Sequence, residues 1–354
     1  MKAHRIGYAL ILWMAATAWA SAAVGASTGE KAVEDVAKPA AKSETVDSVM
    51  WKETEWFDAA RGRPVPVRIY YPIAGKGPFP IILFSHGLGR SREDCAYLGI
   101  HWARLGYVSV YVEHSGSDEA VWRGTIQPKK HLKEAYENPA TMRNRPLDLR
   151  FALDRLEQLK GEGDSLAVRL DFSRVGAAGY DLGAQTALAL AGQMLPGELI
   201  EADSRVRAVV AMSPPVPLGR VSLDTAYQAI HVPCLYITGT EDNGIVGETK
   251  AYQRRIPFDR VNGADQYLAT FFGGDHMIYA GHMRAREGGK RDTSLQPFIR
   301  EASTLFWEAY LGEKPQAIAA LRGTGLNAVL GSTASVEKKL VAVEKKLAAD
   351  KLAN

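Results

Sequence analysis

Seven short apolar segments lie between residues 65 and 272, each bounded by Gly, Pro or charged residues. Their apolar residues are nearly continuous, which is typical of strands buried on both faces. The segments between them are amphipathic, and apolar side chains recur at helical spacing in residues 147–159 and 295–309. The pattern predicts strands at residues 65–71, 80–85, 107–112, 175–179, 206–212, 234–238 and 267–272.

The alternation of strands with helices predicts an α/β fold, a mostly parallel sheet with helices on both faces. In such sheets the ligand crevice lies at the carboxyl ends of the strands. Residues that carry chemistry should therefore follow directly after the apolar segments.

The N-terminal part of the chain differs in pattern from this region. Residues 1–23 have a positive start, a largely apolar stretch and small-residue cleavage sites, which is typical of a secretory signal peptide. Residues 24–50 are rich in Ala, Lys, Glu, Ser and Thr, and we expect a flexible linker. The pattern predicts a periplasmic or secreted protein, with no stable membrane insertion after cleavage and one domain over residues 51–312.

Residues 313–354 form a predicted C-terminal helical tail. Val336, Leu340, Val343 and Leu347 are spaced as in two coiled-coil heptads. Because two heptads are too few to specify a coiled coil, we expect a short surface helix. A module that binds a partner through this tail stays an alternative, and the oligomeric state stays open.

Composition narrows the classes of function. The 354 residues are 46% apolar and carry a formal net charge of +3, so we expect a large core and no nucleic-acid partner. Cys95 and Cys234 are too few for a thiolate zinc site, and the eight histidines lack paired ligand spacing. We therefore expect two unpaired thiols, no metal, no cofactor, and a small-molecule or lipid-like substrate.

The candidate chemistry centres on the pentapeptide Gly179-Tyr180-Asp181-Leu182-Gly183. It lies between a predicted strand and a predicted helix, like the strained turn of a nucleophile elbow, and has small residues at its two ends. The turn places its central side chain at a helix N-terminus, which favours an anion such as Asp181. The alternative at this point is a glycine-containing loop whose aspartate only caps the helix.

Three further motifs follow predicted strands. Residues 85–89, with the sequence SHGLG, form a tight turn whose backbone N–H groups can point into the crevice. Asp242 and His276 follow the sixth and seventh predicted strands and supply an acid and a base. Together with Asp181, the chain order is oxyanion loop, nucleophile, acid, base, which is the order that an α/β-hydrolase requires.

From residue 51 to residue 312 the chain resembles the α/β-hydrolase superfamily, in particular the bacterial dienelactone-hydrolase-like and platelet-activating-factor-acetylhydrolase-like esterases. The motifs that carry the resemblance are SHGLG at 85–89, EHSGSD at 113–118, RPLD at 145–148, GYDLGAQT at 179–186, ITGTED at 237–242 and GGDHM at 273–277. The resemblance implies an oxyanion hole made by the backbone N–H groups of Leu88 and Leu182, an orienting acid at Asp242 and a base at His276. Members have serine at position 181, so this chain departs from them at the residue that attacks.

An aspartate changes which bonds the site can break. Attack of Asp181 on an ester carbonyl would give a mixed anhydride, which is high in energy. Displacement at a saturated carbon would give an alkyl ester, which water activated by His276 can hydrolyse. We expect first a hydrolase of carboxylic esters, lipid esters or lactones with an Asp181-His276-Asp242 constellation, in which Asp181 either attacks covalently or positions water with His276. A hydrolase of haloalkanes or epoxides with Asp181 as nucleophile, and a silent homologue that only binds ligand, stay open.

Other residues near these motifs receive supporting roles. Residues 213–230 are too short for a cap domain, so residues 115–144 are expected to arch over the crevice. Tyr180 is expected to pack, with polarisation of a substrate as the alternative. Structural roles are expected for the remaining polar residues, namely His86, His114 and Asp118 in loops and Asp148 as a helix cap.

Overall fold

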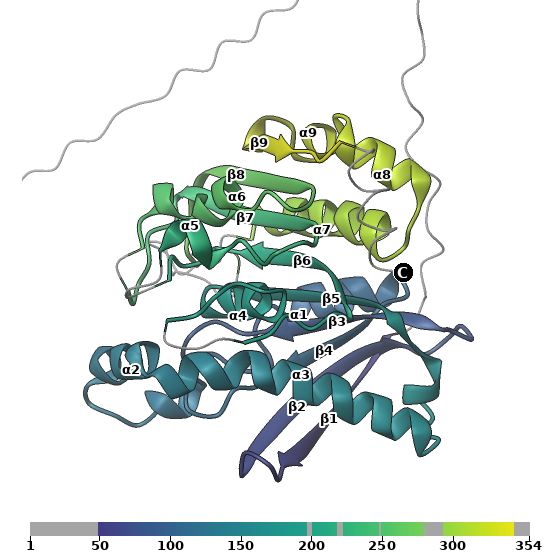
Figure 1. Ribbon diagram of the computed structural model, residues 1–354, viewed down its shortest axis with the longest axis vertical. Helices are drawn as coiled ribbons and strands as arrows, with labels where there is room; N and C mark the ends of the chain where they lie inside the picture. Colours follow the sequence, from purple (N-terminus) through teal and green to yellow (C-terminus); the bar gives the residue numbers. More distant parts are fainter. Residues whose placement is uncertain are drawn as a thin grey trace, which may run out of the picture. The chain divides into compact units, whose positions relative to one another are not determined.

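A mixed sheet organises the described part of the chain (Figure 1). The computed structural model describes residues 49–196, 200–217, 222–247, 249–277, 279 and 293–342. Within those residues nine strands pair in the order β1-β2-β4-β3-β5-β6-β7-β8-β9. Their bounds are β1 Val49–Asp58, β2 Arg63–Pro72, β3 Phe79–Ser85, β4 Val108–Val112, β5 Leu170–Tyr180, β6 Val206–Met212, β7 Cys234–Glu241, β8 Gln266–Asp275 and β9 Ala334–Lys339.

Strand direction divides the sheet into a parallel centre and antiparallel margins. Strands β4, β3, β5, β6, β7 and β8 run parallel, whereas β1, β2 and β9 pair antiparallel. All seven apolar segments predicted as strands lie on strands, and only Tyr107 falls one residue outside. The predicted fold class is therefore confirmed as a mostly parallel sheet with helices on both faces, an α/β-hydrolase fold. No separate cap domain is present among the described residues.

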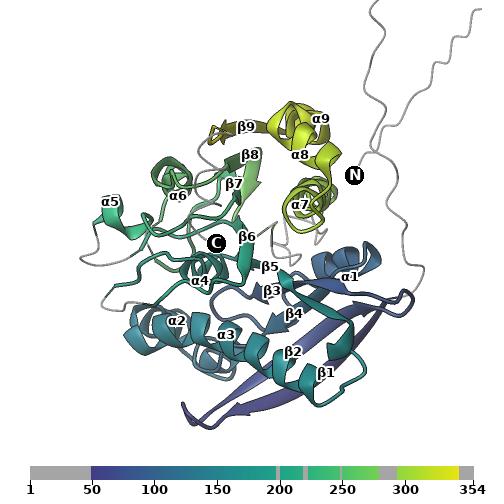
Figure 2. The same cartoon turned by 45° about the vertical axis from the view of Figure 1, so that its right-hand side comes forward.

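Helices cover both faces of the sheet (Figure 2). The α-helices are α1 Ala96–Arg104, α2 Pro128–Glu137, α3 Pro139–Gly161, α4 Leu182–Leu190, α5 Leu223–Ala226, α6 Ile256–Arg260, α7 Gln296–Tyr310, α8 Pro315–Arg322 and α9 Gly325–Leu330. Short 3-10 turns lie at η1 Glu119–Val121, η2 Ala167–Arg169, η3 Ala251–Gln253 and η5 Gly331–Thr333. In this view, α3 and α4 lie on one side of the sheet and α1 and α7 lie on the other.

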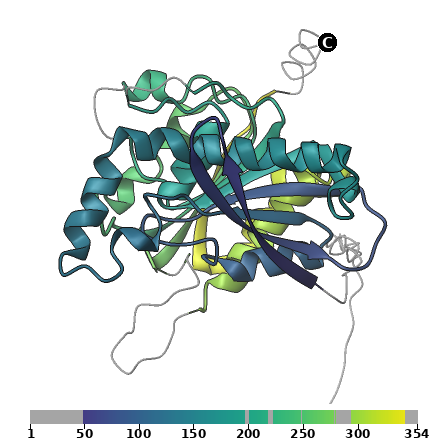
Figure 3. The ribbon, with the colours of Figure 1, turned by 90° about the horizontal axis from the view of Figure 1, so that it is seen from below.

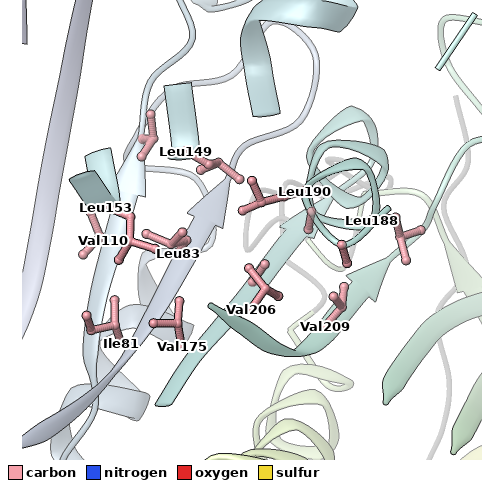
Figure 4. Packing of buried hydrophobic residues seen from close by; sticks show 14 of the residues in the cluster. Ile81, Leu83, Val110, Leu149, Leu153, Val175, Leu188, Leu190, Val206 and Val209 are labelled. Carbon is pink, nitrogen blue, oxygen red and sulfur yellow. The ribbon is translucent and has the colours of Figure 1, made fainter. Parts of the chain in front are cut away.

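Two hydrophobic clusters follow from the alternation of side chains along each strand. In β3, Ile81 and Leu83 face one cluster while Ile82 and Phe84 face the other. The first cluster packs against α3 and α4, as Figure 4 shows for labelled side chains of both helices. The second packs against α1 and α7, where Trp307 is fully buried. Both faces of the parallel strands are thus dry, which explains their continuous apolar sequences.

Strand β1 was absent from the sequence prediction. Among the described strands it pairs with β2 alone, and the two form a long hairpin at the sheet margin (Figure 3). Its sequence mixes charged residues with the exposed aromatics Trp51 and Phe57, so it lacks an apolar run. The strand begins at Val49, so the last two residues of the predicted linker belong to the sheet.

The predicted tail helix around Val336 is corrected by the structure. Residues 334–339 form β9, antiparallel to β8, with Val336 opposite Ala269. The Lys339 ammonium group donates to the carbonyls of Phe258, Asp259 and Val261 at 3.0, 3.0 and 2.8 Å, at the C-terminus of α6. Sheet pairing and these bonds outweigh the weak helical preference of two heptads.

Several predictions concern residues outside the described ranges. The predicted signal peptide at 1–23, residues 24–48 of the predicted linker, and the tail after residue 342 all lie there. In the ranges that the structure covers, no helix has the length and apolarity needed to cross a bilayer.

Both cysteines are free and buried, as predicted. Cys95 precedes α1 and its thiol donates to the carbonyl of Tyr279 at 3.0 Å. Cys234 begins β7 and belongs to the cluster under α3 and α4. The two thiols therefore serve packing on opposite faces of the sheet.

Candidate active site

The strand ends bring the predicted site residues to one edge of the sheet. Leu88 follows β3, Asp181 follows β5, Asp242 follows β7 and His276 follows β8. These four strands are parallel, so their carboxyl ends meet at the same edge. Residues far apart in sequence are thus brought together at this edge.

The pentapeptide forms a strained turn between β5 and α4. Asp181 is the N-cap residue of α4 with φ 53° and ψ −123°, a conformation that non-glycine residues rarely adopt. A Cβ added at Gly183 would lie 1.9 Å from the Ser85 carbonyl oxygen. One added at Gly179 would lie 2.1 Å from the carbonyl oxygen of Gly183. Strand and helix therefore approach as closely as in a nucleophile elbow.

His276 lies between two carboxylates. Its Nδ1 is 2.8 Å from Asp242 Oδ1, and its Nε2 is 3.7 Å from Asp181 Oδ1. Since the buried Asp242 carboxylate only accepts hydrogen bonds, Nδ1 carries the proton and Nε2 is left as the basic nitrogen. The imidazole is thus oriented as a base directed at the cavity.

The Asp242 carboxylate is held by groups that the sequence analysis did not identify. Ser213 Oγ donates to Oδ1 at 2.7 Å and Thr238 Oγ1 donates to Oδ2 at 2.9 Å. The buried Arg254 guanidinium donates to the carbonyls of Asp242 and Ser213 at 3.2 and 2.9 Å. Burial alone would raise the pKa of Asp242, but the His276 hydrogen bond and the Arg254 charge hold it below its usual value.

The two predicted oxyanion donors differ in their partners. The Leu88 N–H donates to Asp181 Oδ2 at 3.2 Å, so Asp181 itself occupies this donor. Leu182 is the first residue of α4, where a backbone N–H has no intrahelical partner. Asp181 thus occupies the Leu88 donor, whereas the Leu182 N–H has no partner within its helix.

A cavity of about 240 Å³ lies at Leu88, Asp181 and His276. Its polar wall holds Asp181 and His276, and Arg90 is the cationic residue of its lining. The other lining residues are Leu88, Gly89, Trp122, Leu132, Tyr180, Ile245 and Val246. Trp122 and Leu132 come from residues 115–144, so this segment does border the cavity. The lining is mainly apolar beside a compact polar group, as in small-molecule sites.

The polar tips of the two aromatic residues in this cavity are already bonded. The Tyr180 hydroxyl donates to the His276 carbonyl at 2.6 Å. The Trp122 indole N–H donates to the Gly89 carbonyl at 2.7 Å. Tyr180 therefore packs and braces the His276 loop, which agrees with the interpretation expected first.

Structural roles were predicted for four polar residues, and three of them, His86, His114 and Asp118, have such roles in the structure. His86 is buried, with Nδ1 2.7 Å from the Gly87 carbonyl and Nε2 accepting from the His114 N–H at 3.0 Å. Asp118 accepts from the Ala120 N–H at 3.1 Å and caps η1. His114 contacts Ser85 at its Nε2 atom.

Asp148 does not cap a helix, contrary to the prediction. It lies in the middle of α3, which begins at Pro139 and is capped by the Asn138 side chain. Its carboxylate instead accepts from Arg61 and Arg63 at 2.7 and 3.0 Å. The helix starts earlier than its apolar spacing indicates because Pro139 is accommodated in the first turn.

Among the described residues, no group of three or more His, Cys, Asp or Glu side chains is placed to hold a metal ion.

The chain is similar in sequence to one protein-family model and to one known protein. Residues 61–155 match the family model of platelet-activating factor acetylhydrolase, isoform II. A platelet-activating factor acetylhydrolase of Cavia porcellus is 23% identical over 275 residues, which cover 70% of this chain. The chain spans 61% of the length of that relative. Both likenesses support an α/β-hydrolase-like family, and the family-model match ends before Asp181.

Proposed function

We propose that the chain is a hydrolase of carboxylic esters, lipid esters or lactones that acts through Asp181, His276 and Asp242. The observation that carries this proposal is the geometry of His276, with Nδ1 fixed by Asp242 at 2.8 Å and Nε2 directed at Asp181 Oδ1 at 3.7 Å. The likeness to platelet-activating factor acetylhydrolases supports the ester class. The apolar walls of the cavity suit the acyl or alkyl part of such a substrate.

The proposed reaction uses water as the nucleophile. A water molecule that hydrogen-bonds to both His276 Nε2 and Asp181 Oδ1 fits acceptors 3.7 Å apart. His276 Nε2 takes a proton while the water oxygen attacks the ester carbonyl carbon. The Leu182 N–H binds the developing oxyanion, and the alkoxide leaving group recovers the proton from His276. The products are a carboxylic acid and an alcohol.

A second function is favoured by the Leu88–Asp181 hydrogen bond. If Asp181 Oδ1 displaces a leaving group at a saturated carbon, the resulting ester has its carbonyl oxygen at Oδ2. That atom already accepts from the Leu88 N–H at 3.2 Å, where it would be stabilised during hydrolysis by water. Haloalkanes and epoxides are the substrates of this route.

The cavity lining suits hydrolysis of haloalkanes or epoxides less well than hydrolysis of esters. Displacement of a halide or opening of an epoxide needs a donor for the departing atom. The Tyr180 hydroxyl and the Trp122 indole N–H, which are the aromatic donors of the cavity, are bonded to backbone carbonyls. Arg90 is the lining residue left to act as a donor for this purpose.

Hydrolysis in heavy-oxygen water separates the two routes. Direct attack by water puts one heavy oxygen into the product acid and none into Asp181, whereas the covalent route puts it into the Asp181 carboxylate. Mass analysis of the peptide that contains Asp181 after a single turnover reads the difference. Label in Asp181 during ester turnover would reject the water mechanism.

A panel of short aryl esters, lactones, haloalkanes and epoxides tests the class of reaction. The expected result is turnover of esters or lactones that is lost in Asp181→Asn and His276→Ala. Tight binding without turnover of any of these compounds would reject the hydrolase and favour a ligand-binding homologue.

A further inference from the structure

Arg145 is a buried cation in α3 that the proposed mechanism does not use. Its side chain is 1% exposed, and burial lowers its pKa to about 9, so it stays charged at neutral pH. In the described part of the chain it forms no direct ion pair, and its hydrogen bonds go to hydroxyl and carbonyl oxygens. Because a buried charge without a paired carboxylate is costly, such a residue needs a reason to be kept.

The four hydrogen bonds of Arg145 join separate parts of the site. Nε donates to Thr186 Oγ1 at 2.9 Å and Nη1 donates to Ser117 Oγ at 2.7 Å. Nη2 donates to Ser85 Oγ at 3.0 Å and also to the His86 carbonyl. A planar guanidinium has the fork geometry that these diverging contacts require.

Two of these contacts lead to the oxyanion donors. His86, whose carbonyl is held, lies two residues before Leu88 in the turn that aims the Leu88 N–H. Thr186 in turn donates its hydroxyl to the Leu182 carbonyl at 2.8 Å, within the first turn of α4. Arg145 therefore links the backbone of both donors, which come from segments almost a hundred residues apart.

A buried Ser-His-Asp relay fixes the serine that Arg145 contacts. Arginine only donates, so Ser85 Oγ accepts from it and its own proton goes to His114 Nε2 at 2.9 Å. The His114 Nδ1–H then donates to Asp148 Oδ2 at 3.0 Å. Burial lowers the pKa of His114 well below its usual value, which keeps the ring neutral in this tautomer.

This relay has the connectivity of a catalytic triad without access to substrate. Ser85, His114 and Asp148 are each fully buried. None of them lines the cavity that holds Asp181. Its role is thus to hold Ser85, and through Ser85 the position of the guanidinium.

We infer that Arg145 is a positioning residue that sets the place of the Leu88 and Leu182 N–H groups relative to Asp181. The inference rests on the proposed hydrolase function for its effect on rate. Burial lowers the pKa of Arg145, and the negative charges of Asp181 and Asp148 partly offset this effect. Through its hydrogen bonds, Arg145 ties the oxyanion turn and the elbow helix, whose N-cap is Asp181, into one rigid unit.

Arg145→Lys tests this role, because lysine keeps the charge but cannot span the same acceptors. With an ester substrate of the panel above, kcat should fall about 10- to 100-fold while KM stays within about threefold. Amide hydrogen exchange in a peptide covering residues 86–90 should become faster. Arg150→Gln is the matched control on α3, since Arg150 contacts residues 201 and 203 instead, and it should change neither readout.

Thr186→Val provides a second variant that keeps the fold if Arg145→Lys does not. It removes the contact between Arg145 and α4 together with the Thr186 bond to the Leu182 carbonyl, so kcat should again fall with KM nearly unchanged. A folded Arg145→Lys or Thr186→Val protein with wild-type kcat would overturn the inference, whatever the exchange shows. If the wild-type protein hydrolyses no ester, the proposed function fails by itself. Exchange at residues 86–90 then decides the structural part, and wild-type exchange in Arg145→Lys would overturn it.

Discussion

The backbone N–H of Leu88 donates to Asp181 Oδ2 at 3.2 Å, so a donor expected to bind the substrate oxyanion binds the side chain at the elbow instead. The rest of the machinery lies in place around this contact, with His276 Nδ1 2.8 Å from Asp242. The chemistry of the site therefore depends on the length and charge of one side chain.

Asp181→Ser should hydrolyse esters faster than the wild-type protein does. A serine is shorter and uncharged, so it frees the Leu88 N–H for the substrate and supplies a hydroxyl nucleophile to His276. Hydrolysis of short aryl esters should exceed that of Asp181→Ala by at least about 10²-fold. A serine variant that is folded and as slow as the alanine variant would show that the oxyanion donors or His276 are misplaced.

Asp242→Asn should reduce kcat by about 10³- to 10⁴-fold with little change in KM. An amide at this position can donate to His276 Nδ1, which would move the ring proton to Nε2 and remove the base. Steady-state kinetics on the substrate turned over best measure the change. Thr238→Val is the control, since it removes one bond to the Asp242 carboxylate at 2.9 Å and leaves the charge, and its effect should stay under about tenfold. Equal losses in both variants would contradict the role of the charge.

The positions of the strands could be predicted because each parallel strand is dry on both faces. Segments such as 206–212 have apolar side chains in both hydrophobic clusters. Their continuous apolar sequence therefore has the same bounds as the strand. Strands β1 and β9 lie at sheet margins, where half of the side chains meet water. Their charged residues interrupt the continuous apolar run by which the other strands were predicted. For β9, the pairing with β8 is also a long-range interaction that the local sequence does not encode.

The candidate site was predictable where its residues directly follow strands. Asp181, Asp242 and His276 occupy such positions, and Asp181 and His276 line one cavity while Asp242 is buried behind His276. Arg145, Ser213 and Arg254 act through bonds to residues distant in sequence, and no local spacing marks them. The hydrogen bond between Leu88 and Asp181 likewise depends on the folded turn, so it could not be anticipated from either motif alone.

Gly183→Ala should destabilise the fold by about 3 kcal/mol or more. Its Cβ would meet the Ser85 carbonyl oxygen at 1.9 Å, and neither backbone segment can move without disturbing the sheet. Chemical denaturation measures the free energy of unfolding. Gly161→Ala, at the end of α3 with open space around its Cβ position, should instead stabilise the protein by about 0.5 kcal/mol. Similar effects at both glycines would contradict the close approach of strand and helix.

Removing residues 334–354 should lower the melting temperature by about 5 °C or more. The truncation takes away β9, exposes the edge of β8 and removes the Lys339 bonds to the end of α6. Removing only residues 343–354 keeps all of these contacts and should leave the melting temperature within about 1 °C. Thermal unfolding followed by circular dichroism compares the two. Equal melting temperatures for both truncations would show that β9 adds little to the sheet.

Asp94→Asn should stabilise the protein more at pH 8 than at pH 4. Asp94 lies under the oxyanion turn with 1% exposure, and burial raises its pKa from 3.8 to about 6 despite the nearby Arg90 charge. Between these two values the folded state holds a proton that the unfolded state has released, so stability falls as pH rises. The full difference is about 3 kcal/mol, present below pH 4 and lost above pH 6.

Asparagine stays neutral, so this variant should not show that loss, and urea unfolding at both pH values measures the contrast. Asp171→Asn is the control of opposite sign. Burial acts to raise the pKa of Asp171, but hydrogen bonds from Ser173 and Arg174 outweigh it and lower the pKa. Its contribution is present above pH 4 and is lost only as pH falls below that value, so the stability cost of Asp171→Asn should be nearly equal at pH 8 and at pH 4 and should shrink at pH 3. A pH-independent effect of Asp94→Asn would mean that Asp94 is ionised in the folded protein throughout this range.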